Sequence, residues 1–298
     1  MNGLARVEDD DPFVVHRRLL FTIAYELLGS AGDAEDVLQE SWLRWAASDR
    51  SDIRQPRAYL VRVVTRQALN HLRTVARRRE EYVGEWLPEP LLTSPDVADD
   101  VELAESVSIA MLTVLETLRP SERAVFVLRE VFDVPYAEIA QTLGKSQSAV
   151  RQIAHRAKGH VAARSPRVRV VRSEHEEVVA RLVAALNSGD LDGLMSVLAP
   201  DVVSVADGGG KARGAARRPI VGAAKLARYL VGGMAKAGPS LVAVPTWVNG
   251  RTGIRMELSG QLVGVASLVV ADGRVTQVYT TANPDKLGWL DEGADLGR

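Results

Sequence analysis

The stretch VPYAEIAQTLGKSQSAVRQIAHRAK, from Val134 to Lys158, predicts two short helices joined by a tight turn. In this prediction Tyr136 to Leu143 forms the first helix, Gly144 supplies a left-handed turn residue, and Ser146 caps the second helix. The inward face of the second helix follows from its apolar positions: Val150, Ile153, Ala154 and Ala157. The spacing of helix, turn and helix is that of a helix-turn-helix.

The outward face of the second helix carries amide, hydroxyl, imidazole and guanidinium groups near its N-terminal end. These residues are Gln147, Ser148, Arg151, Gln152, His155 and Arg156. Such groups at this end of a recognition helix can contact base edges in the major groove of a duplex. A solvated amphipathic helix pair is the alternative. The agreement of turn, cap and outward chemistry favours DNA binding.

The bulk composition sets the limits for the rest of the chain. With 298 residues, 46% apolar and 25% charged, the sequence is long enough for two or three globular domains. The absence of cysteine excludes disulfides and thiolate zinc sites, and it fits a cytoplasmic protein. The acidic segment 1–12 does not resemble a signal peptide, and no apolar run is long enough for a bilayer. We therefore expect no membrane association, no metal site and no cofactor.

Charge is segregated although the net charge is only −1. Residues 53–79 hold eight arginines and no carboxylate, whereas residues 80–105 hold nine carboxylates and no Lys or Arg. In the basic segment Arg62, Arg66, Asn70 and Arg73 fall at spacings of three and four and share one helical face, with Tyr59 close by; Arg57 is a further candidate. A basic stripe beside aromatic and amide groups suits a single nucleic-acid strand, with a plain solvated face as the alternative.

Helical periodicity covers the first part of the chain. The apolar pattern predicts a helix that ends at Gly29, a second helix, AEDVLQESWLRWAA, capped by Asp33, and a third that Pro56 opens. An acidic linker, 80–104, follows, then a second helical segment, 105–163, and a joint, 164–172.

From residue 173 to 298 the pattern changes to an α+β domain. We expect helices at 174–187, 190–199 and 220–236, and His175 on the first of them is expected to be exposed. Strands are expected at 201–206 and near 240–248, 252–258, 261–270 and 274–281, in a curved antiparallel sheet.

Three segments together resemble regions 2 and 4 of the extracytoplasmic-function (ECF) RNA polymerase sigma factors. They are DAEDVLQESWLRW (33–45), PRAYLVRVVTRQALNHLR (56–73) and LRPSERAVFVLREVFDVPYAEIAQTLGKSQSAVRQIAHRA (118–157). The resemblance implies two all-α sigma domains, region 2 within 1–79 and region 4 within 105–163. It departs from the common pattern at Arg66-Gln67…Asn70, so a −10 base preference is not carried over.

The resemblance also implies partners and contact residues. Core RNA polymerase would be contacted through its β′ clamp helices and β flap, with Asp36, Gln39, Glu40 and Leu43 as the clamp candidates. The basic stripe would hold the −10 single strand, and the helix-turn-helix would contact the −35 duplex. The acidic linker would lie in a basic polymerase channel, or act as a mere flexible spacer.

The last domain resembles the SnoaL-like branch of the NTF2 fold, a cone of helices against a sheet. The resemblance rests on ALNSGDLDGLMSVLAPDVVSVADGGG (185–210), the late strands and TTANPDKL (280–287). Some relatives are isomerases, cyclases or hydrolases, and Asp207 is the candidate general base for that alternative. We expect no enzyme, because no Asp–His or Tyr–Asp pair converges by spacing, but an unidentified small ligand could occupy the cone. DGGGK lacks the Ser or Thr of a phosphate-binding Walker loop.

Three short motifs narrow the resemblance to the SigJ-like subgroup of ECF sigma factors, which carry a fused SnoaL-like domain. They are WLPEP (Trp86, Leu87, Pro88, Glu89, Pro90), DGGGK (Asp207, Gly208, Gly209, Gly210, Lys211) and NPDKL (Asn283, Pro284, Asp285, Lys286, Leu287). The resemblance implies that the fused domain regulates the sigma factor in cis. We hypothesise that Trp86, Leu87 and Pro88 dock beside the Gly-rich loop, with Glu89 near the basic segment 211–218. A polymerase-independent one-component regulator, with a ligand-sensing NTF2-like domain, is the alternative function.

Overall fold

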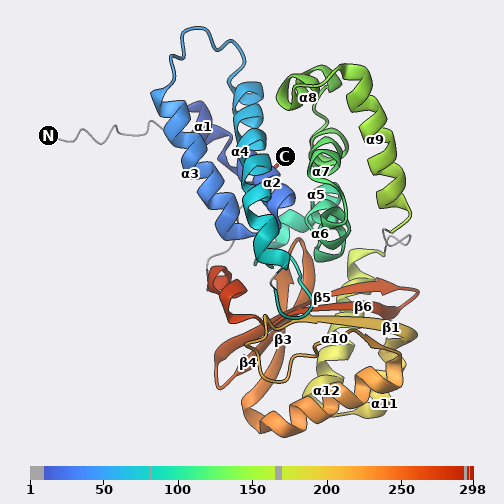
Figure 1. Ribbon diagram of the computed structural model, residues 1–298. Coiled ribbons are helices and arrows are strands. Elements are labelled where there is room, and N and C mark those ends of the chain that lie inside the picture. Colours follow the sequence, from blue (N-terminus) through green and yellow to red (C-terminus); the bar gives the residue numbers. More distant parts are fainter. Residues whose placement is uncertain (1–9, 81, 165–169, 292–293, 295) are drawn as a thin grey trace, which may run out of the picture. The chain divides into compact units, whose positions relative to one another are not determined.

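The computed structural model describes residues 10–80, 82–164, 170–291, 294 and 296–298 (Figure 1). The chain divides into two compact units. The first comprises residues 1–77, 115–163 and 295–298, and the second comprises 78–114 and 164–294. The extreme N-terminal segment 1–9 and residues 165–169 of the predicted joint lie outside the described residues. Among the helices described, none has the length and apolarity needed to cross a membrane.

The first unit begins with a helical layer: α1 (Pro12–Val15), α2 (Arg17–Leu28), α3 (Ala31–Ala47) and α4 (Pro56–Glu80, as far as Arg77). Gly29 ends α2 with a φ of 71°, as predicted. The predicted cap of α3 is wrong: Ser30 is the N-cap, and its side chain accepts a hydrogen bond from the Asp33 backbone N–H at 3.2 Å. Asp33 lies in the first turn instead, where its charge still complements the helix dipole.

The same unit holds the predicted helix-turn-helix. This part of the unit consists of the end of α6 (Ile109–Glu116, of which Leu115 and Glu116 belong to this unit), α7 (Pro120–Phe126), the π-helical turn η2 (Val127–Val131), α8 (Tyr136–Leu143) and α9 (Gln147–Ala162). The helix-turn-helix is formed by α8 and α9. Gly144 has a φ of 62°, and the Ser146 hydroxyl accepts from the Ala149 N–H at 3.2 Å. The predicted inward face of α9 is buried. Turn, cap and packing are therefore confirmed.

The second unit contains the α+β domain. Its elements are α10 (Arg172–Ser188), α11 (Leu191–Val197), β1 (Leu198–Asp207), β2 (Ile220–Val221), α12 (Ala223–Ala237), η3 (Gly238–Ser240), β3 (Leu241–Val248), β4 (Arg251–Leu258), β5 (Gln261–Ala271), β6 (Arg274–Thr281), η4 (Pro284–Lys286) and η5 (Gly288–Asp291). The strand order is β2-β1-β6-β5-β4-β3. The helices α10, α11 and α12 pack their aliphatic side chains against one sheet face. In the described residues this cone interior is a packed core.

The expectation of an antiparallel sheet is wrong in one place. β3 to β6 form an antiparallel meander, but β1 pairs with β6 in parallel. The predicted helix 220–236 begins only at Ala223, because Ile220 and Val221 form β2 on β1. α12 then carries the chain to the far side of the sheet, so the last strand returns beside the first in the same direction. The predicted helix 190–199 ends at Val197 for a related reason: Leu198 already belongs to β1.

The linker packs on the opposite face of this sheet and contains η1 (Pro95–Ala98) and α5 (Val101–Ser106). The Asn249 side chain at the β3–β4 turn accepts from the Leu91 N–H at 2.9 Å and donates to the Val107 carbonyl at 2.8 Å. The Thr93 N–H donates to the Trp247 carbonyl at 3.2 Å. These bonds pair the backbone of residues 91–93 with the β3–β4 turn, so this part of the linker is not a mere flexible spacer in this structure.

Gly250 sets how closely the linker approaches the β3–β4 turn. A Cβ there would lie 2.8 Å from the Ala104 Cα, and the φ of 73° already disfavours a side chain. Gly260, at the β4–β5 turn, has a similar φ of 78° and open space around its Cβ. We expect Gly250→Ala to cost about 1–3 kcal/mol more unfolding free energy than Gly260→Ala, because only the first adds a clash. Urea unfolding of both full-length variants measures the two losses of unfolding free energy. Equal losses would contradict the close approach of Ala104 to Gly250.

His175 is buried, so the expectation that it is exposed is wrong. Its relative exposure is 5%, and its Nε2 lies 2.7 Å from the Thr252 carbonyl oxygen, while Nδ1 has no partner among the described residues. Residues 174–187 carry an apolar stripe that turns this side chain against β4. Burial, and then the charge of Arg251, lower the pKa of His175, against the opposing effects of the Thr252 bond and Glu176.

A histidine with a lowered pKa in the folded state stabilises the fold above its unfolded pKa and loses that contribution as pH falls below about 6.5. We expect His175→Leu to flatten the decline of stability between pH 7 and pH 5, by up to about 1.4 kcal/mol per pH unit. Urea unfolding across this range measures the slope. His155→Leu, an exposed position on α9, is the control for losing one histidine. A slope unchanged by His175→Leu would contradict the burial argument.

Candidate functional site: the linker clasp and the exposed helical faces

The Asp207 carboxylate, at the end of β1, is completely buried and accepts four hydrogen bonds. Its Oδ1 accepts from the Tyr82 hydroxyl and, at 3.1 Å, from the Gly209 N–H. Its Oδ2 accepts from the Leu87 N–H at 3.0 Å and from the Lys286 Nζ at 2.8 Å. Two carboxylate oxygens offer about four acceptor positions, so all of them are used.

The Lys286 ammonium is equally well satisfied. Besides Asp207, it donates to the Leu87 carbonyl oxygen at 2.5 Å, and its Nζ lies 3.3 Å from the centroid of the Trp86 ring. The side chain is 4% exposed. Burying a charge is costly unless it is paired and hydrogen-bonded, and a cation over an indole face adds to the pairing. Trp86 and Leu87 therefore surround this ammonium with one ring face and one carbonyl.

Tyr82 connects the carboxylate to the C-terminal motif. Its hydroxyl accepts a hydrogen bond from Asn283 Nδ2 at 2.8 Å, and its ring meets Trp86 edge to face at 4.6 Å. Burial raises the pKa of Tyr82, and the hydrogen bond and charge of Asp207 raise it further. The phenol thus stays protonated as a donor. We call Tyr82, Trp86, Leu87, Asp207, Asn283 and Lys286 the linker clasp.

The Gly-rich loop is shaped by its contacts with the other two motifs. A Cβ on Gly209 would lie 2.4 Å from Asn283 Nδ2, and a Cβ on Gly210 would lie 3.2 Å from Val83. Both glycines have positive φ, 57° and 70°, where a side chain is strained in any case. Lys211 pairs with Asp285 at 2.5 Å, but this pair is exposed. The glycines therefore permit the close approach that closes the clasp.

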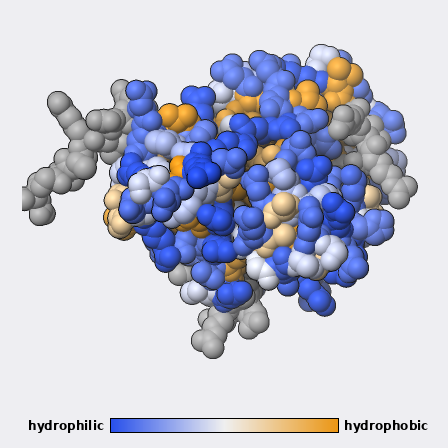
Figure 2. Space-filling view, turned by 90° about the horizontal axis from the view of Figure 1, so that it is seen from above, coloured by the Kyte–Doolittle hydropathy of each residue, from blue (hydrophilic) through white to orange (hydrophobic). Residues whose placement is uncertain are grey.

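The first unit presents polar and basic helical faces. The six residues predicted on the outer face of α9 are all exposed, and the Arg151 guanidinium lies 5.6 Å from the Tyr136 ring centroid. Figure 2, which views the molecule from above, is hydrophilic over most of the visible face. On α3, Asp36, Gln39, Glu40 and Leu43 are exposed, Leu43 by 62%. An apolar side chain this exposed on a charged helix is a candidate partner contact.

The basic stripe on α4 is partly engaged within the unit. The Arg66 guanidinium donates to two carbonyls at the end of α8, those of Thr142 at 2.9 Å and Gln141 at 2.8 Å. The Gln67 amide is buried and donates to Glu40 at 2.7 Å. Arg57, Asn70 and Arg73 are exposed, and Tyr59 and Arg62 are half-buried.

Comparison with known proteins matches these helical layers to two family models. The model described as Sigma-70 region 2 matches residues 13–79, and the model described as Sigma-70 region 4 matches residues 108–161. The chain is 41% identical over 290 residues to the ECF RNA polymerase sigma factor SigJ of Mycobacterium tuberculosis, covering 92% of this chain and 91% of that one.

This chain belongs to the ECF RNA polymerase sigma factors. It is also 33% identical to the probable ECF RNA polymerase sigma factor SigI of Mycobacterium tuberculosis, with 95% of each chain covered. The crystal structure of Mycobacterium tuberculosis SigJ superposes with a TM-score of 0.75 at 38% identity, covering 93% of this chain and 97% of that one. The resemblance to the ECF sigma factors of the SigJ-like subgroup is thus confirmed, which favours transcription initiation over the one-component and isomerase alternatives.

In this sigma factor, the structure brings together some residues of the three motifs that the sequence predicted to be in contact. Trp86, Leu87, Asp207, Asn283 and Lys286 meet in the clasp. Pro88 and Pro90 are buried beside them, whereas the expected approach of Glu89 to the basic segment stays a prediction. The regulatory role of these motifs also stays a prediction. Sequence reasoning missed Tyr82, although an aromatic side chain four residues before Trp86 in an acidic segment was a usable signal.

Asp207 does not have the environment of a general base. Its acceptor positions are filled by an ammonium, a phenol and two backbone N–H groups, so a substrate proton finds no free oxygen. It lies on the sheet face that the linker covers, because its β1 neighbour Ala206 is buried on the other side. Asp207 therefore acts here as a structural acceptor.

The clasp offers a matched pair of lysines for a test. We expect Lys286→Met to lower the unfolding free energy by about 3–5 kcal/mol, because it leaves the buried Asp207 carboxylate without its cation. Lys211→Met removes an exposed pair and should cost less than about 1 kcal/mol. Urea unfolding of the full-length variants, followed by circular dichroism, measures both. Similar small losses in the two variants would show that the clasp contributes little to stability.

Proposed function

We propose that this sigma factor binds core RNA polymerase and directs promoter-specific initiation, with region 4 on the −35 duplex and region 2 on the −10 single strand. The observation that carries the first assignment is the exposed polar face of α9, with its cap at Ser146 and its amide and guanidinium groups at the N-terminal end. Base-edge contacts by Arg151, Gln152 and their neighbours would give specificity, while Arg156 would contact phosphate.

The polymerase contacts follow from α3 and from family membership. Asp36, Gln39, Glu40 and Leu43 form one exposed face, which we assign to the clamp helices of the β′ subunit. Leu43 would supply the apolar contact and the carboxylates would supply charge complementarity. The β flap is assigned to region 4. The protein then acts where the polymerase is, in the cytoplasm.

We propose further that the fused C-terminal domain regulates the sigma factor through the clasp. The clasp holds residues 82–87 against β1 and η4, which shortens the free chain between regions 2 and 4. Arg66, a −10 candidate, is bonded to the end of α8 in the first unit, so it must leave those carbonyls before it can contact DNA. Both observations support a closed state that opens on polymerase. Prolines in the linker lower the entropy lost on docking.

The test is run-off transcription with core polymerase alone, on the region upstream of the gene and on a pool of genomic promoter fragments. We expect transcripts only when the protein is added, because a sigma factor supplies promoter recognition to core enzyme. Arg151→Ala should lower promoter-specific product by about 5- to 100-fold, since one base-reading contact is worth about 1–3 kcal/mol. Arg213→Ala, on the basic loop of the C-terminal domain, is the matched control.

A second arm separates the regulatory proposal from the sigma assignment. Trp86→Ala removes the ring from the Lys286 ammonium, and we expect it to change the yield of promoter-specific transcript. Lys211→Met, which removes only an exposed ion pair, should leave that yield unchanged. Transcripts that are the same with Trp86→Ala as with the parent protein would contradict regulation through the clasp. Transcripts that appear only with a second sigma factor present would instead establish a polymerase-independent regulator.

A further inference from the structure

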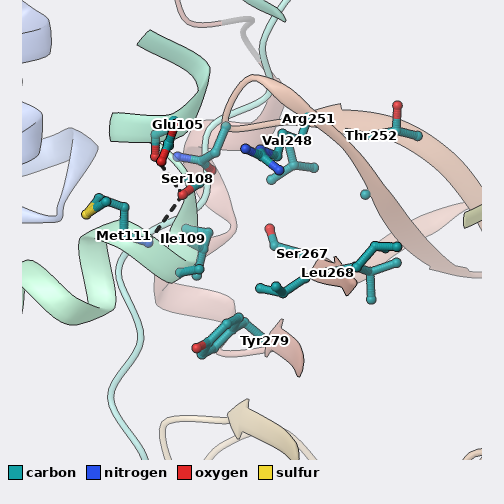
Figure 3. A pocket seen from close by; sticks show the side chains of 15 residues that line it. Glu105, Ser108, Ile109, Met111, Val248, Arg251, Thr252, Ser267, Leu268 and Tyr279 are labelled. Carbon is teal, nitrogen blue, oxygen red and sulfur yellow. Dashed lines mark hydrogen bonds between the residues drawn. The ribbon is translucent and has the colours of Figure 1, made fainter. Parts of the chain in front are cut away.

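A small cavity lies where residues 105 and 108–111 meet β4, β5 and β6. Its volume is about 60 Å³ (Figure 3). The strands contribute Arg251, Ser267, Val269 and Tyr279, with Ser267 directly opposite Tyr279 in the β5–β6 ladder. The alternation of β5 puts the Ser267 and Val269 side chains on the face opposite that of Leu268 and Val270, which belong to the helix-covered core and also line the cavity.

The other wall comes from the segment that joins the linker to region 4. Residues Glu105 and Ser108 to Met111 line the cavity, and the Sigma-70 region 4 match begins at residue 108. Ile109, Met111, Val248 and Val269 are among the lining residues and supply apolar surface. An occupant would therefore touch β4 to β6 and the first turn of α6 at once.

Arg251 gives the cavity its chemistry. Its side chain is half-buried and makes no hydrogen bond or ion pair with any described residue. Burial lowers the pKa of the Arg251 guanidinium, and the charge of Glu105, which acts only through space, raises it. A guanidinium withdrawn from most of its water, without a carboxylate in contact, is a strong donor for a bidentate anion.

The hydroxyl groups leave one further donor for an occupant. The Ser108 hydroxyl donates to the Glu105 carbonyl at 2.8 Å, and the Tyr279 hydroxyl donates to Gln277 at 2.8 Å. Ser267 makes no side-chain hydrogen bond within the described part of the chain. One half-buried cation, one available hydroxyl and an aliphatic wall together match a carboxylate head on a short aliphatic chain.

We propose that this cavity is a binding site for a short-chain aliphatic carboxylate, held by Arg251 and Ser267 between the sheet and α6. The size agrees: a water needs roughly 10–15 Å³ of such volume, so the space suits a ligand of about four to six non-hydrogen atoms. The carboxylate lies on Arg251 and Ser267, and its chain lies between Ile109, Met111 and Val269. The site goes beyond the proposed function, which holds whether or not the cavity is occupied.

Propionate is the probe, and propionamide is its uncharged match in shape. Saturation-transfer NMR with the full-length protein at constant ionic strength should give saturable propionate binding with a Kd of order 1 mM, and propionamide at least about 10-fold weaker. Arg251→Met should weaken propionate by about 10- to 100-fold. Arg255→Met is the matched control, because Arg255 lies on the same face of β4 but pairs with Glu257 at 2.6 Å. It should leave the Kd within about 3-fold.

Equal binding of propionate and propionamide, or an unchanged Kd in Arg251→Met, would overturn the proposal. So would the lack of saturable binding up to about 50 mM, a concentration far above the expected Kd. Circular dichroism checks that Arg251→Met folds. If it does not, Ser267→Leu fills the cavity and leaves Arg251 in place. Loss of propionate binding in this folded variant supports the site, and retention of binding rules it out.

Discussion

The Asp207 carboxylate is the group on which the second unit depends. A charge with no solvent exposure is tolerated only when every acceptor position has a donor and a cation lies nearby. Its donors come from three places in the sequence: the linker (Tyr82 and Leu87), the Gly-rich loop (Gly209) and the C-terminal motif (Lys286). Removing any one of them leaves the others around an unsatisfied charge. The contribution of each motif to stability therefore depends on the other two, although about 120 residues separate the first motif from the second.

This interdependence links the linker to the transcription machinery of the chain. The linker buries Leu87, Leu91 and Val97. Side chains of the α+β domain accept hydrogen bonds from its backbone, and the Thr93 hydroxyl accepts one from the Gly250 N–H. Its end passes into α6, whose C-terminal turn belongs to the unit with regions 2 and 4. Under the proposals above, a change in the clasp or a ligand beside α6 would act on the chain segment that precedes the helix-turn-helix. Within the first unit, Arg66 is a candidate for contacting DNA, and in this structure its guanidinium donates to carbonyls at the C-terminal end of α8.

Local rules predicted most of the helical part. Gly29, Pro56, Gly144 and Ser146 begin or end helices as expected, because capping depends on the residue and its immediate neighbours. The misplaced cap at Asp33 is the same kind of local choice: two polar residues three positions apart both suit an N-cap, and the extended backbone at Ser30 decided between them. His175 and the parallel β1–β6 pair were not predicted, because both depend on which distant strand packs against the element.

The sequence by itself determined the helix-turn-helix, the basic and acidic segments and the three short motifs, since periodicity, turn residues and charge are local properties. It also placed Trp86, Asp207 and Lys286 among the candidate residues. Only the tertiary structure decided that Lys286 is the cation of Asp207, that Tyr82 completes its shell, and that Arg251 lies without a contacting carboxylate in a cavity. The physical reason is that pairing and desolvation depend on distances between segments far apart in the chain, which spacing along the sequence does not encode.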